Sequence, residues 1–414
     1  MHRNKILPTI LLTHYGDNWI RGSERCLLDL IANIDRKKFR IVLWCNSQIL
    51  GKAASAFKIK VITTDFTRLF NNTAVFRISD YFRIANIGEH IIDKYDVKLV
   101  HANSAAPSLW LNGICREKKI PLISHLHSSY TLKDRIIFGL HKATITVGVS
   151  GAVLHGLAKD GIPTSKLKII RNGLDVKQLL AQQKINIRKQ LNLKERDYLV
   201  ATTASLIHRK GIDLAISAII KIRKRGIPIH FLVLGEGPVR SELEKIIRDN
   251  NASDFVHLYG ESDNIVGILR GGVNLFISTT KEESFGLSIA EASLSSLPVV
   301  APNIGEIPTI VKNNLSGKLY PRHNERYLIE SIVDIYKNRV NSRNMGTCGF
   351  RHIISHYDIR KYINEFENLY SDTIVNNIKH PSSNTKLYLS IIPRSIALSF
   401  FGILRNSLRY GATS

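Results

Sequence analysis

The segment LFISTTKEESFGLSIAE, residues 275–291, joins a short apolar run to a helical pattern. The run has the length of a buried strand, and we expect a helix to begin at Gly286. Because ligands of α/β proteins bind outside the carboxyl ends of strands, we expect Glu283 to face a ligand site. Glu291 would lie about a turn and a half inside the helix, where its carboxylate could accept two hydrogen bonds from a ribose diol. The alternative interpretation is a surface helix with two solvated acids.

Short β-branched runs alternate with helical patterns through most of the chain, which is typical of parallel βαβ architecture. A chain of 414 residues also favours two domains, because one hydrophobic core rarely grows to that size. We therefore expect two doubly wound α/β units joined near residues 176–196. The predicted strands lie at 6–13, 40–45, 61–63, 99–101, 122–125 and 144–149, and then at 198–204, 230–234, 256–258, 275–278 and 298–301.

Positive charge is concentrated in the first half of the chain. The net charge is +24, and residues 1–200 carry 32 Lys and Arg against 15 Asp and Glu. Such a field attracts polyanions, either nucleic acid or an anionic membrane surface. The alternative is a solvated basic face, and charge alone does not decide between these interpretations.

Cysteine usage and hydropathy favour a cytoplasmic protein. The four cysteines include no CxxC pair, so we expect neither a zinc site nor a disulfide framework. The apolar start of the chain is followed by no cleavage site of small residues, and we interpret it as a buried strand rather than a signal peptide. Since no stretch of about 18 apolar residues lacks charges, we expect no segment to span a bilayer.

Several blocks of the chain resemble, in the same order, those of one enzyme family, the retaining GT-B glycosyltransferases of family 4 (glycosyl transferases group 1). Glu283 and Glu291 match the two acids of its E-x7-E motif. The resemblance covers roughly residues 6–370, and the ordered blocks together are much more specific than any one of them. The other blocks are the glycine-rich turn 21–25, Val149-Ser150 with 170–175, the turn 234–238, and 303–308 with Ser316-Gly317.

The resemblance implies which residues bind the donor. Glu291 would hold the ribose hydroxyls, and Lys210 would place a positive charge on the phosphates. Gly22 would let its backbone N–H approach the diphosphate, because glycine has no Cβ to block it. The donor sugar would be held by Glu283 and by the backbone of Phe285, Gly286 and Leu287.

The resemblance also implies the catalytic residues, His127 and Glu283. His127 matches the family histidine near the reacting carbon, whereas we expect His125 to be structural and to lie on the strand face opposite His127. The family usually has an arginine five residues before the lysine, where this sequence has Ser205. Either Arg209 takes over the phosphate contact from the same loop, or Arg209 is a solvated neighbour and the site is weakened.

The implied fold is GT-B, α/β with two Rossmann-like domains facing a cleft, and the implied reaction is a retaining, metal-independent sugar transfer without a cofactor. The partners would be a nucleotide-sugar donor and a glycan or lipid-linked acceptor, as in assembly of a bacterial surface polysaccharide. Lys210, helix N-termini and backbone amides would stabilise the leaving diphosphate, and no DxD metal motif occurs. The leaving phosphate would accept the proton of the acceptor.

Four segments follow from this comparison. Residues 1–180 would bind the acceptor, 181–355 the nucleotide sugar, 356–376 would form a helix returning to the first domain, and 377–414 a basic amphipathic tail. Within the tail, residues 393–410 place arginines on one helical face and Phe, Ile and Leu on the other, a pattern that suits an anionic membrane surface. The alternative is that this stripe packs on the enzyme's own surface.

Two other functions compete with sugar transfer to an acceptor. A nucleotide-sugar epimerase of the GT-B fold would convert or hydrolyse its donor without any acceptor. A basic nucleic-acid-binding protein would explain the charge of +24, yet no nucleic-acid-binding module is recognised, so we expect no nucleic acid partner. Binding to DNA that survives physiological salt would favour that class. A dinucleotide dehydrogenase fits poorly, because the fingerprint that begins at Gly235 has Arg240 in place of its third glycine.

Overall fold

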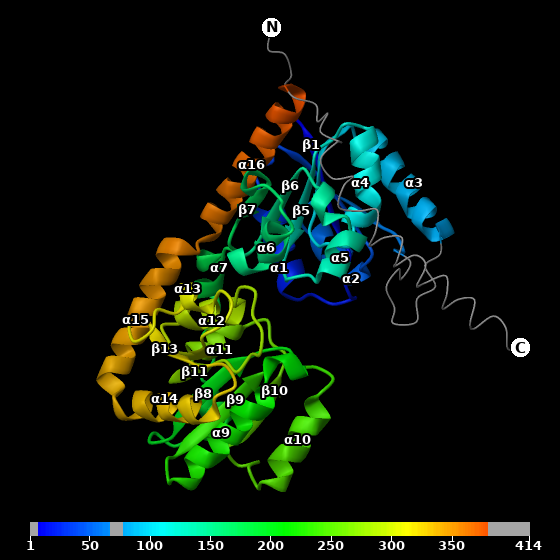
Figure 1. Ribbon diagram of the computed structural model, residues 1–414. Helices are drawn as coiled ribbons and strands as arrows, with labels where there is room; N and C mark the ends of the chain where they lie inside the picture. The colour runs from blue at the N-terminus through cyan, green and yellow to red at the C-terminus, as the bar shows by residue number, and fades with distance from the viewer. Residues whose placement is uncertain (1–6, 67–77, 380–414) are drawn as a thin grey trace, which may run out of the picture.

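The computed structural model describes residues 7–66 and 78–379, which form two parallel sheets with helices on their faces (Figure 1). The first sheet has seven strands in the order β3-β2-β1-β4-β5-β6-β7. Every strand pairs in parallel with its neighbours, and Thr9 of β1 aligns with Arg40 of β2. The strands are β1 (Thr9–His14), β2 (Arg40–Cys45), β3 (Lys60–Thr63), β4 (Val97–Ala102), β5 (Leu122–Leu126), β6 (Ile145–Gly148) and β7 (Leu167–Ile169).

The second sheet has six strands in the order β10-β9-β8-β11-β12-β13, again all parallel. Its order reverses between β8 and β11, as that of the first sheet reverses between β1 and β4. In open α/β sheets such a switch point is where ligands bind, because the two adjacent loops leave in opposite directions. The strands are β8 (Tyr198–Thr203), β9 (Ile229–Leu234), β10 (Val256–Gly260), β11 (Leu275–Ile277), β12 (Val299–Pro302) and β13 (Gly317–Tyr320).

Helices cover both faces of the first sheet because successive strand residues point to opposite faces. Ile10 and Leu12 of β1 pack in one cluster with the first two helices and the last, whereas Leu11 packs in another with the third and fourth helices. The helices of this half are α1 (Gly22–Asn33), α2 (Gln48–Ser55), α3 (Ile78–Lys94), α4 (Ser108–Glu117), α5 (Leu132–Ile137) and α6 (Gly151–Lys159). The next two helices, α7 (Val176–Ala181) and α8 (Ile187–Gln190), contribute Leu179 and Ile187 to a cluster that includes β8 of the second sheet.

The second sheet is covered in the same way, and one of its two clusters extends into the first half of the molecule. Leu126 and Val149 from the first half share this cluster with Phe285 and Ile289 from the second. The helices of this half are α9 (Ile212–Lys224), α10 (Arg240–Asp249), α11 (Ile265–Leu269), α12 (Leu287–Leu294), α13 (Ile307–Ile310), α14 (Glu325–Lys337) and α15 (Arg339–His356).

The final helix, α16 (Ile359–Lys379), packs against the first sheet although it follows the second in the chain (Figure 1). The sequence predicted a helix over 356–376, but His356 ends α15 and the backbone leaves helical geometry at Tyr357. The chain there forms a parallel bridge between Asp358 and Leu174. The two crossings between the halves of the molecule therefore lie side by side and are hydrogen-bonded to each other.

Candidate functional site

The loops that leave β8 and β11 at the switch point of the second sheet bring Lys210 and Glu283 together. The Lys210 Nζ lies 2.6 Å from Oε2 of Glu283, and both side chains are mostly buried, with 19% and 14% of their surfaces exposed. Gly211 fixes this approach, because its φ is +63° and a Cβ there would lie 2.4 Å from the carbonyl oxygen of Thr279. The two loops are thus locked against each other.

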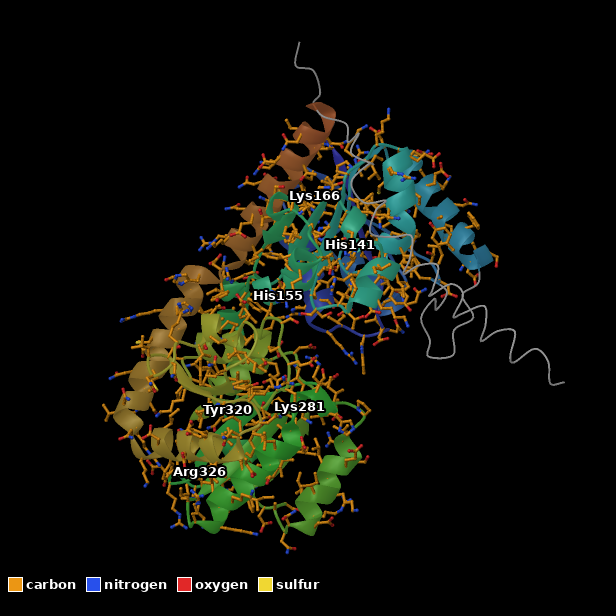
Figure 2. All side chains as sticks on the ribbon, in the orientation of Figure 1. His141, His155, Lys166, Lys281, Tyr320 and Arg326 are labelled. Carbon is orange, nitrogen blue, oxygen red and sulfur yellow. The ribbon has the colours of Figure 1, made fainter. Side chains whose placement is uncertain are left out.

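Further hydrogen bonds join these loops. The backbone N–H of Lys281 donates to the carbonyl of Arg209, and the Arg209 guanidinium donates to the carbonyl of Glu282 at 3.0 Å. Figure 2 shows Lys281 on the side of the second sheet that is turned toward the first, whereas Arg326 of α14 lies farther from the first sheet. Arg209 is exposed and its guanidinium is hydrogen-bonded to the neighbouring loop, so its predicted phosphate contact stays a prediction, as does the effect of Ser205.

The segment after Glu283 turns sharply into α12 at Gly286. Its φ of +108° belongs to the region that favours glycine, and α12 begins at the next residue, Leu287. Phe285 is buried, and the Leu287 side chain lies 3.4 Å from the position that a Cβ of Gly22 would take. The amino end of α12 in the second half therefore lies against the amino end of α1 in the first half.

Glu291 of α12 is positioned at the same boundary. Burial raises its pKa to about 7, while Arg25 of α1 opposes the shift and Asp29 of α1 adds to it. The pKa of Asp29 is itself raised to about 6, chiefly by burial. Two carboxyl groups and one guanidinium thus meet where α1 faces α12, and Glu291 holds its proton far more readily than a solvated carboxylate would.

His127 lies directly after β5, at the carboxyl edge of the first sheet. Its Nε2 is 3.1 Å from Oδ1 of Asn103, and burial lowers the pKa of its ring to about 3, so the imidazole is neutral at physiological pH. The prediction that His125 lies on the opposite strand face is wrong, because residues two apart share a face. The two ring centroids are only 4.2 Å apart. His125 is fully buried, and neither of its ring nitrogens has a hydrogen-bond partner among the described residues.

Three residues of this region escaped the sequence analysis: His14, Glu24 and Asn103. The His14 Nε2 lies 2.7 Å from Oε1 of Glu24, and its Nδ1 lies 3.1 Å from Nδ2 of Asn103. His14 ends β1 and Asn103 directly follows β4, so both occupy the switch point of the first sheet. Their places after adjacent strands were the signal available in the sequence.

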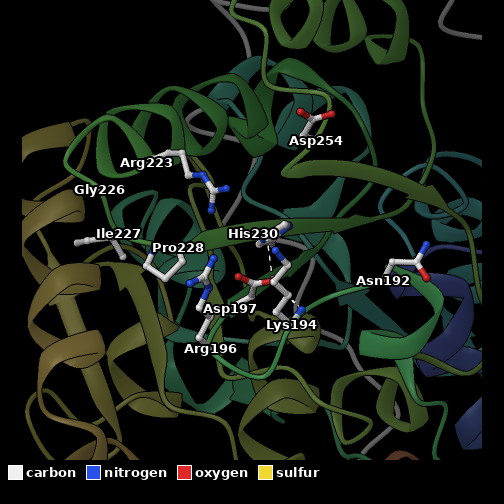
Figure 3. A pocket seen from close by; sticks show the side chains of 10 residues that line it. All are labelled: Asn192, Lys194, Arg196, Asp197, Arg223, Gly226, Ile227, Pro228, His230 and Asp254. Carbon is white, nitrogen blue, oxygen red and sulfur yellow. Dashed lines mark hydrogen bonds and ion pairs between the residues drawn. The ribbon is translucent and has the colours of Figure 1, made fainter.

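Two hollows in the described part of the chain lie away from these residues. They have volumes of about 660 and 640 Å³ and lie on the side of the amino ends of β8, β9 and β10, opposite the edge that carries Lys210 and Glu283. Figure 3 shows the second of them, in which His230 approaches Asp197 near the exposed side chains of Lys194 and Arg196.

Two features are absent from residues 7–66 and 78–379. Within these ranges no three His, Cys, Asp or Glu side chains are grouped as ligands for a metal ion. None of the helices in the same ranges is both long enough and apolar enough to cross a bilayer.

Comparison with known proteins covers both halves of the chain. The family described as Glycosyl transferases group 1 matches residues 183–352, and the one described as Glycosyltransferase Family 4 matches residues 20–178. The chain is similar to N-acetyl-alpha-D-glucosaminyl L-malate synthase of Bacillus anthracis, with 20% identity across 73% of this chain and 82% of that protein. It is also similar to the O-antigen biosynthesis glycosyltransferase WclY of Escherichia coli, with 24% identity across 70% of this chain and 84% of that protein.

Structural comparison gives the same fold. Anabaena Alr3699/HepE, solved in complex with UDP and glucose, matches with a TM-score of 0.74 and 17% identity, covering 87% of this chain and 99% of that one. The expected architecture of two Rossmann-like α/β domains is confirmed.

Proposed function

The chain belongs to the group 1 glycosyl transferases, a family of enzymes that transfer sugars, and from this premise we propose that it moves a sugar from a nucleotide sugar to a glycan or lipid-linked acceptor with retention of configuration. The UDP and glucose bound by HepE support a nucleotide-sugar donor. The role of WclY in O-antigen biosynthesis supports an acceptor that belongs to a bacterial surface polysaccharide. The transfer reaction would take place in the cytoplasm, where nucleotide sugars are available.

The ion pair between Lys210 and Glu283 is the observation that carries this proposal. It lies at the switch point of the second sheet, where a bound ligand would meet both side chains. The diphosphate of a donor would draw Lys210 toward its oxygens, and Glu283 would then accept hydrogen bonds from the sugar hydroxyls. Glu291 and the backbone at Gly22 would bind the ribose and the diphosphate from the facing helices.

Transfer with retention requires the acceptor to approach from the face that the diphosphate leaves. The sugar ring gains positive charge as that bond breaks, and Lys210 with the backbone amides at the start of α12 would stabilise the departing negative charge. The leaving phosphate would accept the proton of the acceptor hydroxyl. His127 would orient a sugar hydroxyl as a neutral ring, consistent with its lowered pKa.

Incubation of the purified full chain with a panel of nucleotide sugars tests the proposal. We expect one donor to bind and to be hydrolysed slowly, and a glycan or lipid-linked acceptor to receive the sugar with the anomeric configuration retained, as read by proton NMR. Epimerisation of the donor without an acceptor would establish the competing isomerase activity instead. Absence of binding to every nucleotide sugar would refute the proposal.

We further propose that an anionic membrane surface is a partner. The supporting observations are the charge of +24 and the amphipathic sequence of residues 393–410, which lie outside the described residues. Truncation after Ser382 is expected to release the protein from anionic liposomes and to reduce transfer to a lipid acceptor while sparing slow donor hydrolysis. If the truncated chain sediments with liposomes as fully as the intact one, the tail is not the anchor.

A further inference from the structure

A chain of polar side chains runs from the start of α1 to His127 through the switch point of the first sheet. The Glu24 carboxylate contacts Nε2 of His14 at 2.7 Å, and Nδ1 of His14 lies 3.1 Å from Nδ2 of Asn103. Oδ1 of Asn103 then contacts Nε2 of His127 at 3.1 Å. Glu24, His14 and Asn103 are all at least 95% buried, so water does not compete for these contacts.

The first member of this series of polar side chains, Glu24, is an ionised carboxylate. Burial alone would raise its pKa, but the hydrogen bond and charge of His14 and two backbone N–H groups lower it to about 2. The ionised carboxylate can only accept hydrogen bonds, so Nε2 of His14 carries a hydrogen and donates a hydrogen bond to Glu24. Its second oxygen accepts from the backbone N–H of Arg21 at 3.0 Å, which ties the carboxylate to the amino end of α1.

The side-chain amide of Asn103 likewise determines which ring nitrogen of His127 carries a hydrogen. Its Nδ2 donates to the carbonyl of Ser23 at 3.1 Å, so the atom that faces His127 is the amide oxygen. An amide oxygen only accepts, and Nε2 of His127 must therefore carry the hydrogen. In a neutral ring the lone pair is then on Nδ1, to which no described residue forms a hydrogen bond.

We propose that Glu24, His14 and Asn103 are positioning residues that hold His127 in one orientation and one tautomer, with Nδ1 free to accept a hydrogen bond from a hydroxyl of the donor sugar. This inference rests on the proposed function, because it assigns the hydroxyl partner of His127 in that reaction. Buried partners of an active imidazole commonly set its tautomer and ring angle. A displacement of about 1 Å in such a group can cost on the order of 100-fold in rate.

Nitrogen NMR of the histidine rings tests the tautomer without any substitution. We expect the unliganded full-length protein at neutral pH to show His127 as a neutral ring protonated at Nε2. Upon addition of the nucleotide sugar, Nδ1 should shift as a hydrogen-bond acceptor, whereas UDP alone should leave it unchanged. A ring that is charged, or protonated at Nδ1, overturns the proposal whatever the activity of the enzyme.

Substitution of Asn103 tests the consequence for the reaction. Asn103→Ala is expected to lower kcat on the order of 100-fold, to keep UDP affinity within about twofold, and to leave a mixture of His127 tautomers. Asn103→Asp keeps an oxygen that can accept a hydrogen bond from Nε2 of His127. It should therefore restore the Nε2-protonated tautomer and recover at least about a tenth of the kcat that Asn103→Ala loses.

The matched control is Asn112→Ala. Asn112 also donates to backbone carbonyls, those of Ser108, Phe138 and Gly139, but it lies in α4 and has no contact with His127. It should lower stability and leave kcat of the folded enzyme within about twofold. Unchanged kcat in Asn103→Ala despite a lost tautomer would overturn the positioning role and leave the transferase proposal intact. Failure of the wild-type chain to use any donor would refute the transferase proposal, and the tautomer measurement would stand by itself.

Discussion

At the scale of single residues, the Lys210–Glu283 ion pair shows how the two side chains proposed to bind the donor are held in the unliganded protein. The two charges neutralise each other at 2.6 Å in a mostly buried place. Each therefore depends on the other for its hydrogen bond, and removal of one leaves the other charge poorly solvated. Under the proposed function, we expect donor binding and stability to be coupled at this pair.

Lys210→Met separates these two contributions when it is compared with the double variant Lys210→Met/Glu283→Gln. The single variant is expected to lose about 1–3 kcal/mol of unfolding free energy, because the Glu283 carboxylate is left without its cation. The double variant should recover most of that stability in urea unfolding. Both should lose donor turnover by at least about 100-fold, since neither places a charge on the diphosphate. Near-normal transfer by the single variant would contradict the assignment of Lys210.

We expect opposite outcomes when the two neighbouring histidines, His125 and His127, are substituted. His127→Ala should lower kcat much more than UDP affinity, because its ring contacts the reacting sugar in the proposed mechanism. His125→Ala should lower the free energy of unfolding by about 2–4 kcal/mol through the cavity it creates, while the folded fraction keeps its kcat. His125→Phe should be better tolerated, since neither ring nitrogen of His125 has a partner to lose among the described residues. Thermal unfolding and steady-state kinetics on the same samples separate these outcomes.

If Glu291 binds the donor ribose as proposed, donor affinity should depend on pH. Its pKa of about 7 means that the carboxyl group is largely protonated below neutrality in the unliganded protein. Ribose hydroxyls donate to the ionised form, so binding releases a proton, and UDP affinity should rise by up to about tenfold from pH 6 to 8 and then level off. Calorimetry in buffers of different ionisation enthalpy measures the released proton. Glu291→Gln retains the titration of UDP itself and should lose the additional dependence; an unchanged pH profile would contradict the role of Glu291.

At the scale of elements, the sequence predicted every inner strand of the two sheets, whereas two of the four edge strands were missed. β2 has the predicted bounds because the run from Arg40 to Cys45 is apolar after its first residue. The edge strands β3 and β10 were predicted at 61–63 and 256–258, whereas β7 and β13 were missed. A lysine interrupts the short apolar run of each missed strand, Lys168 in β7 and Lys318 in β13, and this leaves too little hydrophobic signal to be recognised from pattern alone.

The site divides in the same way. Lys210, Glu283 and Glu291 could be named because each lies in a local block that follows a strand. The contact between His14 and Asn103 joins residues 89 positions apart, and strand order alone determines that their strands are neighbours. No local pattern contains that information, so the polar chain behind His127 became visible only with the sheet.

Because α16 packs on the first sheet, we expect a residue late in the chain to stabilise that sheet. Phe366 is fully buried, with its ring stacked on His101 of β4 at a centroid distance of 5.2 Å. Phe366→Ala is expected to lower the free energy of unfolding by about 3–5 kcal/mol. Hydrogen exchange should accelerate in β4 and β5 more than in β8 and β9. Phe82→Ala is the control, since that ring is 58% exposed and its loss should change stability by no more than about 0.5 kcal/mol.

At the scale of the whole molecule, the two halves are joined along one side by the paired chain crossings. The N–H of Leu174 donates to the carbonyl of Tyr357 at 2.7 Å, and the N–H of Ile359 donates back to Leu174 at 2.9 Å. A second link is the ion pair between Arg171, which lies three residues before Leu174, and Glu306. The Arg171 Nε and the Glu306 Oε1 are 2.7 Å apart. We therefore expect any change in the angle between the sheets to turn about this side of the molecule.

Gly173→Ala tests that arrangement. A Cβ at this position would lie 2.7 Å from Cα of Ile359, closer than packed atoms allow, so the crossings must separate. We expect a loss of more than about 1 kcal/mol in unfolding free energy and a changed radius of gyration with and without UDP in X-ray scattering. Gly113→Ala is the control, because its nearest neighbour would be 3.9 Å away and alanine favours the helix interior. Identical scattering curves for Gly173→Ala and the wild type would show that the crossings do not set the angle.

The return of α16 to the first sheet also has a consequence during synthesis on the ribosome. The surroundings of His101 in β4 are incomplete until its hydrogen-bond partner Tyr370, 269 residues later in the chain, has been synthesised. At a typical elongation rate of about 5–20 residues per second, that interval is roughly 15–50 seconds. The second domain, whose strands and helices are contiguous in the chain, can finish folding first. The nascent first domain meanwhile exposes the apolar surface that α16 later covers, and it is then a natural client for chaperones.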